Sequence, residues 1–113
     1  MNHSSQLPEF EKEFKNLFKK YGSLMEDFQK FERYIFENPT GEGKNFVIIY
    51  SDEKIKIVKT RLSCESLRGR SMRIIYSYKE DILTFMYIEI YFKGDKENED
   101  RGRIKEYLKS CAR

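Results

Sequence analysis

Residues 72–92 read MRIIYSYKEDILTFMYIEIYF, and they are dominated by β-branched and aromatic side chains. Side chains of these kinds favour extended strands, whereas the central Lys79-Glu80-Asp81 is polar and typical of a turn. We therefore expect two antiparallel strands here, over 72–78 and 82–92, joined by that turn.

The side chains of a strand alternate between its two faces, so the strand over 82–92 presents two different sets. The set that we expect to meet the helices is Ile82, Thr84, Met86, Ile88, Ile90 and Phe92. The other set is Leu83, Phe85, Tyr87, Glu89, Tyr91 and Lys93. The second set ends in two tyrosines, a glutamate and a lysine, which indicates a surface that does more than pack.

Two further strands are expected upstream, over 46–51 and 55–62, on either side of Asp52-Glu53. The Asp-Glu pair between two apolar runs is typical of a hairpin turn. Residues 63–70 are polar and contain a glycine, so they are expected to form a loop.

Apolar side chains recur at helical spacing near both ends of the chain. The first stripe is Leu7, Phe10, Phe14, Leu17, Phe18 and Tyr21, and the second is Leu24, Phe28, Phe31 and Ile35. Asn38-Pro39 ends the second helix, and a terminal helix is expected over 98–111. The predicted fold is α+β: two N-terminal helices packed on a four-stranded, mainly antiparallel sheet, followed by a C-terminal helix, with the helices covering one face of the sheet.

The 113 residues fit a single domain over 1–113, with residues 1–6 expected to be a disordered leader. Nine Phe and eight Tyr in so charged a chain argue against disorder elsewhere. No apolar run is long enough to span a membrane and no secretory signal is visible, so a cytosolic protein is expected. The two cysteines, Cys64 and Cys111, and the lone His3 lack metal-ligand spacing, so neither a metal nor a cofactor is predicted.

Positive charge is concentrated in residues 54–73. Seven basic side chains stand there against one acid, Glu65, so this window carries +6 in a chain whose net charge is +3. The basic residues are Lys54, Lys56, Lys59, Arg61, Arg68, Arg70 and Arg73. Such a field suggests an anionic partner, although a solvated charged surface fits the charge alone equally well.

Basic side chains beside aromatic rings suit RNA, because cations neutralise phosphates and rings stack on bases. RNA is cut when its own 2′-hydroxyl attacks the adjacent phosphorus, and Arg or Lys then stabilises the added charge in place of a metal. Glu89 is the candidate base, and Tyr91 or a lysine the candidate acid. Lys59 and Arg61 fall on the face of Ile55 unless a bulge intervenes.

Four motifs stand out: Lys59-Thr60-Arg61, LRGRS over 67–71, Arg73-Ile74-Ile75-Tyr76, and IEIYFKGDKENEDR over 88–101. They resemble motifs of the RelE branch of the RelE/ParE toxin superfamily. The resemblance extends from about Phe10 to Leu108. Ser71-Met72 replaces the usual Gly-Gly of the family, and Glu99 occupies the position of its late tyrosine.

This resemblance implies a toxin of a toxin–antitoxin pair that cleaves mRNA on the ribosome without a metal. The implied catalytic residues are Lys59, Arg61, Arg73, Tyr91 and Lys93, to which the chemistry above adds Glu89. The basic window supplies the expected RNA-binding residues, which are Lys54, Lys56, Arg68 and Arg70. The expected partners are a cognate antitoxin and mRNA on the ribosome, with no membrane and no small-molecule cofactor.

Two other functions remain open at this point. One is a non-enzymatic, ParE-like toxin that binds a topoisomerase. The other is a catalytically inactive relative that binds RNA or a protein partner.

Overall fold

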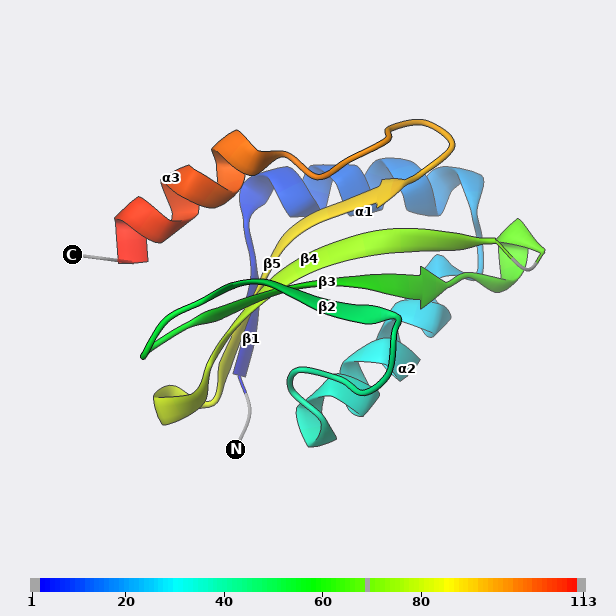
Figure 1. Cartoon of the computed structure of the whole chain (residues 1–113). Coiled ribbons are helices and arrows are strands. Elements are labelled where there is room, and N and C mark those ends of the chain that lie inside the picture. The colour runs from blue at the N-terminus through cyan, green and yellow to red at the C-terminus, as the bar shows by residue number, and fades with distance from the viewer. Residues whose placement is uncertain (1–2, 69, 112–113) are drawn as a thin grey trace.

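The computed structural model describes residues 3–68 and 70–111, which form an α+β fold around a five-stranded mixed sheet (Figure 1). The strands are β1 (His3–Gln6), β2 (Phe46–Ser51), β3 (Lys56–Ser63), β4 (Ser71–Lys79) and β5 (Thr84–Phe92). Their order in the sheet is β1-β5-β4-β3-β2. The helices are α1 (Pro8–Lys20), α2 (Leu24–Glu37) and α3 (Arg101–Cys111), with short 3-10 turns at Glu65–Leu67 and Glu80–Ile82.

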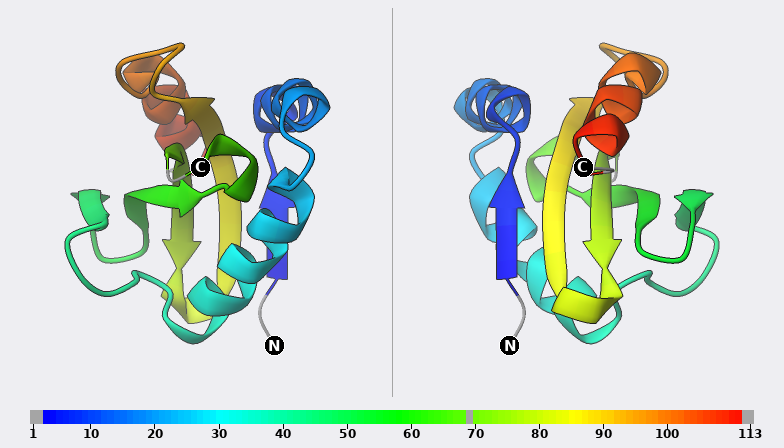
Figure 2. Two further views of the ribbon diagram at one scale, coloured as in Figure 1. Left: turned by 90° about the vertical axis from the view of Figure 1, so that its right-hand side faces the viewer. Right: turned by 90° about the vertical axis from the view of Figure 1, so that its left-hand side faces the viewer.

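Helices α1 and α2 cover one face of the sheet with the two predicted apolar stripes (Figure 2). The Phe10 ring lies 5.4 Å from that of Tyr87 and 6.0 Å from that of Phe28, measured between centroids. Rings at these separations stabilise a core beyond the area that they bury. The aromatic stripes are therefore core, as the sequence predicts, except for Phe18, which is 39% exposed.

Helix α3 lies on the opposite face of the sheet, so the prediction that the helices share one face is wrong for this element (Figure 2). Ile104 and Tyr107 of α3 join a second cluster of buried residues, and the Tyr107 hydroxyl lies 2.7 Å from the Ser77 Oγ. The cause lies in β4, where Ile74 and Ile75 are both fully buried although they point to opposite faces. A strand that is apolar on both faces needs cover on both.

The N-terminal residues correct two further predictions. His3–Gln6 form β1, which pairs in parallel with β5, so residues 3–6 are not a disordered leader and the sheet has five strands instead of four. Residues 1 and 2 lie outside the described residues. The backbone of Leu7 continues this pairing by donating to the Tyr87 carbonyl at 3.0 Å. The polar sequence of β1 hid it, because a strand exposed at an edge needs no apolar pattern.

A β-bulge in β5 overturns the predicted alternation in the first half of that strand. Tyr87 pairs with Tyr76 while Glu89 pairs with Ile75, which leaves Ile88 without a partner. The extra residue exchanges the faces before and after it. Phe85 and Tyr87 therefore belong to the core under α1 and α2, whereas Met86 and Ile88 lie toward α3. Ile90 meets the helices on the α1 and α2 face, as predicted.

The strand β3 has no such bulge, so Lys59 and Arg61 fall on the face of Ile55 and Ile57, which is the α3 face. The irregularity in this hairpin lies in β2, between Ile48 and Tyr50. The turn Glu80–Ile82 also delays the start of β5 to Thr84.

Candidate anion-binding site on the sheet

The strand register brings five of the predicted catalytic residues together. Arg61 of β3 pairs with Arg73 of β4, and Arg73 pairs with Tyr91 of β5. In the neighbouring row, Lys59 and Glu89 both lie opposite the same residue of β4. All five therefore lie on the α3 face, the row of Lys59 and Glu89 beside the apolar cluster that α3 covers and the row of Arg61, Arg73 and Tyr91 farther from it.

The first row opens into a groove of about 430 Å³ at the edge of this face. Its lining residues are Arg61, Arg70, Ser71, Arg73, Phe92, Lys93 and Gly94. Two of the cations are held in place: the Arg73 guanidinium donates to the Ser71 Oγ at 2.9 Å, and the Arg70 guanidinium lies 5.0 Å from the centre of the Phe92 ring. A groove lined by four cations, two of them held in place, is a place where an anion is stabilised.

Two like charges face each other across this groove. Burial lowers the pKa of Arg73, and the charge of Arg61 lowers it further. Within residues 3–68 and 70–111 neither guanidinium has an acidic partner in an ion pair. Like charges on paired strand positions destabilise a sheet, and a bound anion would relieve that repulsion.

The second row lies beneath residues 94–100, which we call the cover loop. The Lys59 ammonium donates to the Glu99 carboxylate at 2.9 Å, and the Glu99 side chain is only 3% exposed. The Glu89 carboxylate is fully buried, where it accepts from the Lys96 ammonium and, at 2.7 Å, from the Asp100 amide. Two acid–lysine pairs thus hold the cover loop on the sheet.

Tyr91 is enclosed beneath the cover loop, although its backbone belongs to the first row. The Lys96 ammonium lies 5.6 Å from the centre of its ring, and its hydroxyl is buried without a hydrogen-bond partner among the described residues. Burial raises the pKa of Tyr91, and the nearby Lys59 opposes this increase without cancelling it. The hydroxyl is therefore protonated at neutral pH and able to donate, but the cover loop separates it from solvent.

The chain after the cover loop is anchored to α1. The Arg103 guanidinium donates to both carboxylate oxygens of Glu13 at 2.9 Å, and to the Ile88 carbonyl at the same distance. This hydrogen bonding to Glu13 raises the pKa of Arg103. The Asp100 carboxylate accepts from the Arg103 amide at 3.0 Å, so the start of α3 and the end of the cover loop form one connected unit.

The four predicted RNA-binding residues do not lie together. Arg70 lines the groove, and Arg68 is exposed in the loop before it, at the same end of the sheet. Lys54 belongs to the β2–β3 hairpin, roughly 23 Å from Arg61 along an extended strand. Lys56 is nearer, but it points to the face of α1 and α2.

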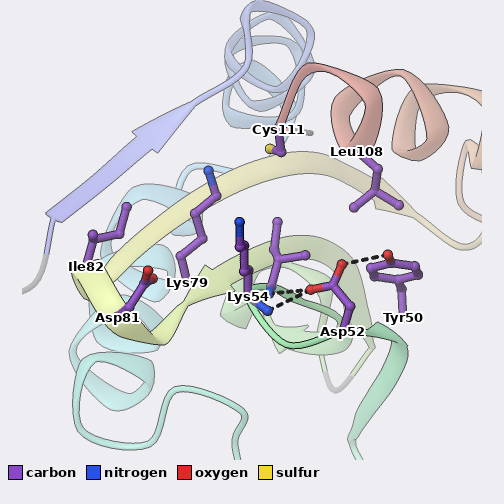
Figure 3. A pocket seen from close by; sticks show the side chains of 9 residues that line it. Tyr50, Asp52, Lys54, Lys79, Asp81, Ile82, Leu108 and Cys111 are labelled. Atoms are coloured by element: carbon purple, nitrogen blue, oxygen red, sulfur yellow. Dashed lines mark hydrogen bonds between the residues drawn. The ribbon is translucent and has the colours of Figure 1, made fainter. Parts of the chain in front are cut away.

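A larger hollow, of about 590 Å³, lies between that hairpin, the β4–β5 turn and the end of α3 (Figure 3). Figure 3 shows Tyr50, Asp52, Lys54 and Lys79 around it. The Asp52 carboxylate is already occupied by the Tyr50 hydroxyl at 2.7 Å and by two backbone amides of the turn. The side chains around this hollow carry charges of both signs, so the hollow attracts an anion less strongly than the groove does.

Several residues that shape the site were not predicted from the sequence. They are Ser71, Lys96, Glu99, Arg103 and Glu13. Glu99 was noticed only as a departure from the family pattern, and a buried acid is invisible in a run of charged residues such as KENEDR. Only contacts between residues far apart in the chain show that this run folds back over Lys59 and Glu89.

No protein-family model and no curated protein sequence matches this chain. In the part of the chain that the structure describes, no group of three or more His, Cys, Asp or Glu side chains is arranged to hold a metal ion. No helix within the same residues has the length and apolar character needed to cross a membrane.

Proposed function

We propose that this chain is a RelE-like toxin that cleaves mRNA on the ribosome, without a metal, by attack of the 2′-hydroxyl on the adjacent phosphate. The observation that carries the proposal is the Arg61–Arg73 pair, two cations on paired strand positions that open onto a groove without acidic partners. The motif resemblance supports the same function, because its motifs contain all four cations of the groove.

The groove is proposed to hold the scissile phosphate. As the 2′-oxygen attacks, the phosphorus gains a fifth oxygen ligand and the group gains negative charge. Arg73, fixed by Ser71, and Arg61 opposite it stabilise that charge, because guanidinium groups donate to two phosphate oxygens at once. Lys93 lies at the rim of the same groove, where it would contact the RNA backbone.

The proton transfers are assigned to Tyr91 and Glu89, which lie beneath the cover loop. Tyr91 is the proposed acid for the leaving 5′-oxygen, because it is protonated at neutral pH and its hydroxyl has no hydrogen-bond partner among the described residues. Reaching the substrate requires the cover loop to lift, which breaks the Lys59–Glu99 and Glu89–Lys96 pairs. The Glu89 carboxylate then becomes available as the proposed base.

An antitoxin is the proposed protein partner. Acidic side chains on such a partner would complement the cations of the groove and exclude RNA from it. The proposed setting of the reaction is the ribosome in the cytoplasm.

One observation favours a second function, a relative that binds RNA without cutting it. Both proposed proton carriers, Glu89 and Tyr91, are buried, while the phosphate-binding cations are open. A topoisomerase-binding toxin is the third candidate, and the density of cations on the sheet argues against it because that function needs no phosphate site.

A translation assay separates the three functions. Purified protein is added to a reconstituted translation reaction, and mRNA 5′ ends are mapped by primer extension. Cleavage at codons in the ribosomal A site, lost in a variant with Arg73→Ala, is the expected result. Intact mRNA with retained RNA binding would establish the non-cutting function, and inhibition of DNA supercoiling by gyrase would establish the third.

A further inference from the structure

The strand β2 forms one edge of the sheet and leaves apolar side chains exposed on both of its faces. Val47 is 50% exposed, Ile48 47%, Ile49 37% and Tyr50 38%. These four consecutive residues form the longest exposed apolar run among the described residues. A contiguous run of exposed apolar side chains of this size commonly marks a surface to which another chain binds.

The edge of β2 also has little protection against pairing. The strand Phe46–Ser51 contains neither a charge nor a proline, which are the usual obstacles to edge-to-edge association. Its single protective device is the bulge between Ile48 and Tyr50. The opposite edge, β1, is formed by the polar sequence HSSQ and lacks any comparable apolar surface.

Four of the five charges within residues 42–54 are opposite in sign about Ile48, and the fifth, Glu53, has Gly43 as its counterpart. Lys44 stands four residues before Ile48 and Asp52 four residues after it, while Glu42 and Lys54 stand six residues before and after. Antiparallel pairing of two identical strands around Ile48 brings Lys44 near Asp52 of the other copy and Glu42 near Lys54 of the other copy. Parallel pairing, by contrast, would place each charge beside its own kind.

We propose that β2 is a self-association surface on which two copies of this chain pair antiparallel, around Ile48, to join their sheets. The same patch on both copies forms such a two-fold contact, so its charge pattern must be self-complementary, as the one about Ile48 is. An acidic partner strand is a weaker candidate, because the charges flanking β2 are of both signs. The proposal does not depend on the proposed function.

Sedimentation equilibrium of the full chain over a wide concentration range tests the proposal. The wild type is expected to dimerise. Ile48→Lys should weaken the dimer by at least about tenfold, because each copy would then bury one lysine charge at the centre of the contact. Met25→Lys, at a residue of similar exposure on α2, is the matched control and should dimerise like the wild type. Far-ultraviolet circular dichroism confirms that each variant is folded.

A charge-reversal cycle identifies the strand orientation. Glu42→Lys and Lys54→Glu should each weaken the dimer by roughly two- to fivefold, and the double variant should restore it, because the pair is then reversed but still complementary. A wild type that stays monomeric up to about 1 mM would overturn the proposal. A dimer that is indifferent to Ile48→Lys, or a double variant no better than the single variants, would overturn it as well.

Discussion

Arg73 is held by a hydrogen bond within its own strand, although a like charge faces it from the next strand. Its guanidinium donates to the Ser71 hydroxyl within its own strand, and Arg61 occupies the paired position of the next strand. Fixing a cation before the substrate arrives avoids an entropic cost during the reaction, which is why strand-borne charges suit phosphate chemistry.

Arg73→Ala should therefore reduce mRNA cleavage by about a hundredfold or more, because it removes a charge that stabilises the transition state. The fold should be retained, since the substitution also relieves the repulsion with Arg61. Initial rates of cleavage, measured beside the thermal unfolding midpoint, check both expectations. Lys54→Ala, at the far end of the same strand pair, is the control, and an equal loss of rate in that variant would show that only overall charge matters.

The Lys59–Glu99 pair makes a prediction about stability and pH. Burial tends to raise the pKa of Glu99, but the hydrogen bond from Lys59, a backbone hydrogen bond and the charges of Lys59 and Arg101 together outweigh it, and the net pKa is lowered. The hydrogen bond between the two side chains raises the pKa of Lys59. Because the pKa of Glu99 is lower in the folded protein, its carboxylate stabilises the fold at pH values above 4.5, the ordinary pKa of the group. This contribution is lost as the pH falls through the lowered pKa of the folded protein.

Glu99→Gln should accordingly lower the free energy of unfolding by about 1–3 kcal/mol at pH 7. The difference from the wild type should shrink as the pH falls below 4.5, because the wild-type carboxylate then becomes neutral too. Chemical denaturation at several pH values measures it. Glu97→Gln, at an exposed position in the same loop, should show no such pH dependence. A constant difference between pH 3 and pH 7 would contradict the role of the ion pair.

At the scale of elements, the cover loop is the part of the site on which the proposed cleavage depends most. The buried Glu89 holds both Lys96 and the Asp100 amide, and removing its charge leaves only a neutral acceptor for each. Glu89→Gln should therefore release the loop while the core under α1 and α2 stays intact.

Amide hydrogen exchange measures that release directly. The Asp100 amide, which donates to Glu89 at 2.7 Å, should exchange at least about tenfold faster in Glu89→Gln, whereas the amides of α2 should keep their rates. Unchanged exchange at Asp100 would mean that the Arg103–Glu13 contact alone holds the loop.

The elements also show where sequence patterns are sufficient. The stripes of α1 and α2 predict their buried faces correctly apart from the exposed Phe18, because a helix that buries one side must repeat every three to four residues. The alternation of β5 fails at Ile88, because a single inserted residue exchanges the faces without leaving a mark in the composition. The strand β1 is missed for the opposite reason: it is polar and exposed, so nothing distinguishes it from a loop.

At the scale of the whole molecule, charge is distributed unevenly. The window 54–73 carries +6 while the chain carries +3, and the fold separates that window into the groove at one end of the sheet and the hairpin lysines at the other. RNA should therefore contact the groove cations first, and the hairpin lysines should contribute mainly through the long-range field.

Binding of a short single-stranded RNA should weaken as the salt concentration rises, with a log–log slope of about −3 for some four phosphate contacts. Arg61→Ala combined with Arg73→Ala should reduce the magnitude of that slope by about 1 to 1.5, since two contacts are lost. Fluorescence anisotropy at several salt concentrations measures the slopes. Lys54→Ala with Lys56→Ala is the control pair, and an equal change there would place RNA along the whole strand.

The helical stripes, the hairpins and the concentration of basic residues follow from the sequence, because they depend on local periodicity and composition. Tertiary structure decided which of those basic residues meet. Strand register placed Arg61 against Arg73, and the return of residues 94–100 over the sheet buried Glu89, Tyr91 and Glu99. These outcomes depend on contacts between residues far apart in the chain, where one bulge or one buried ion pair changes which side chains face solvent, and no local pattern records them.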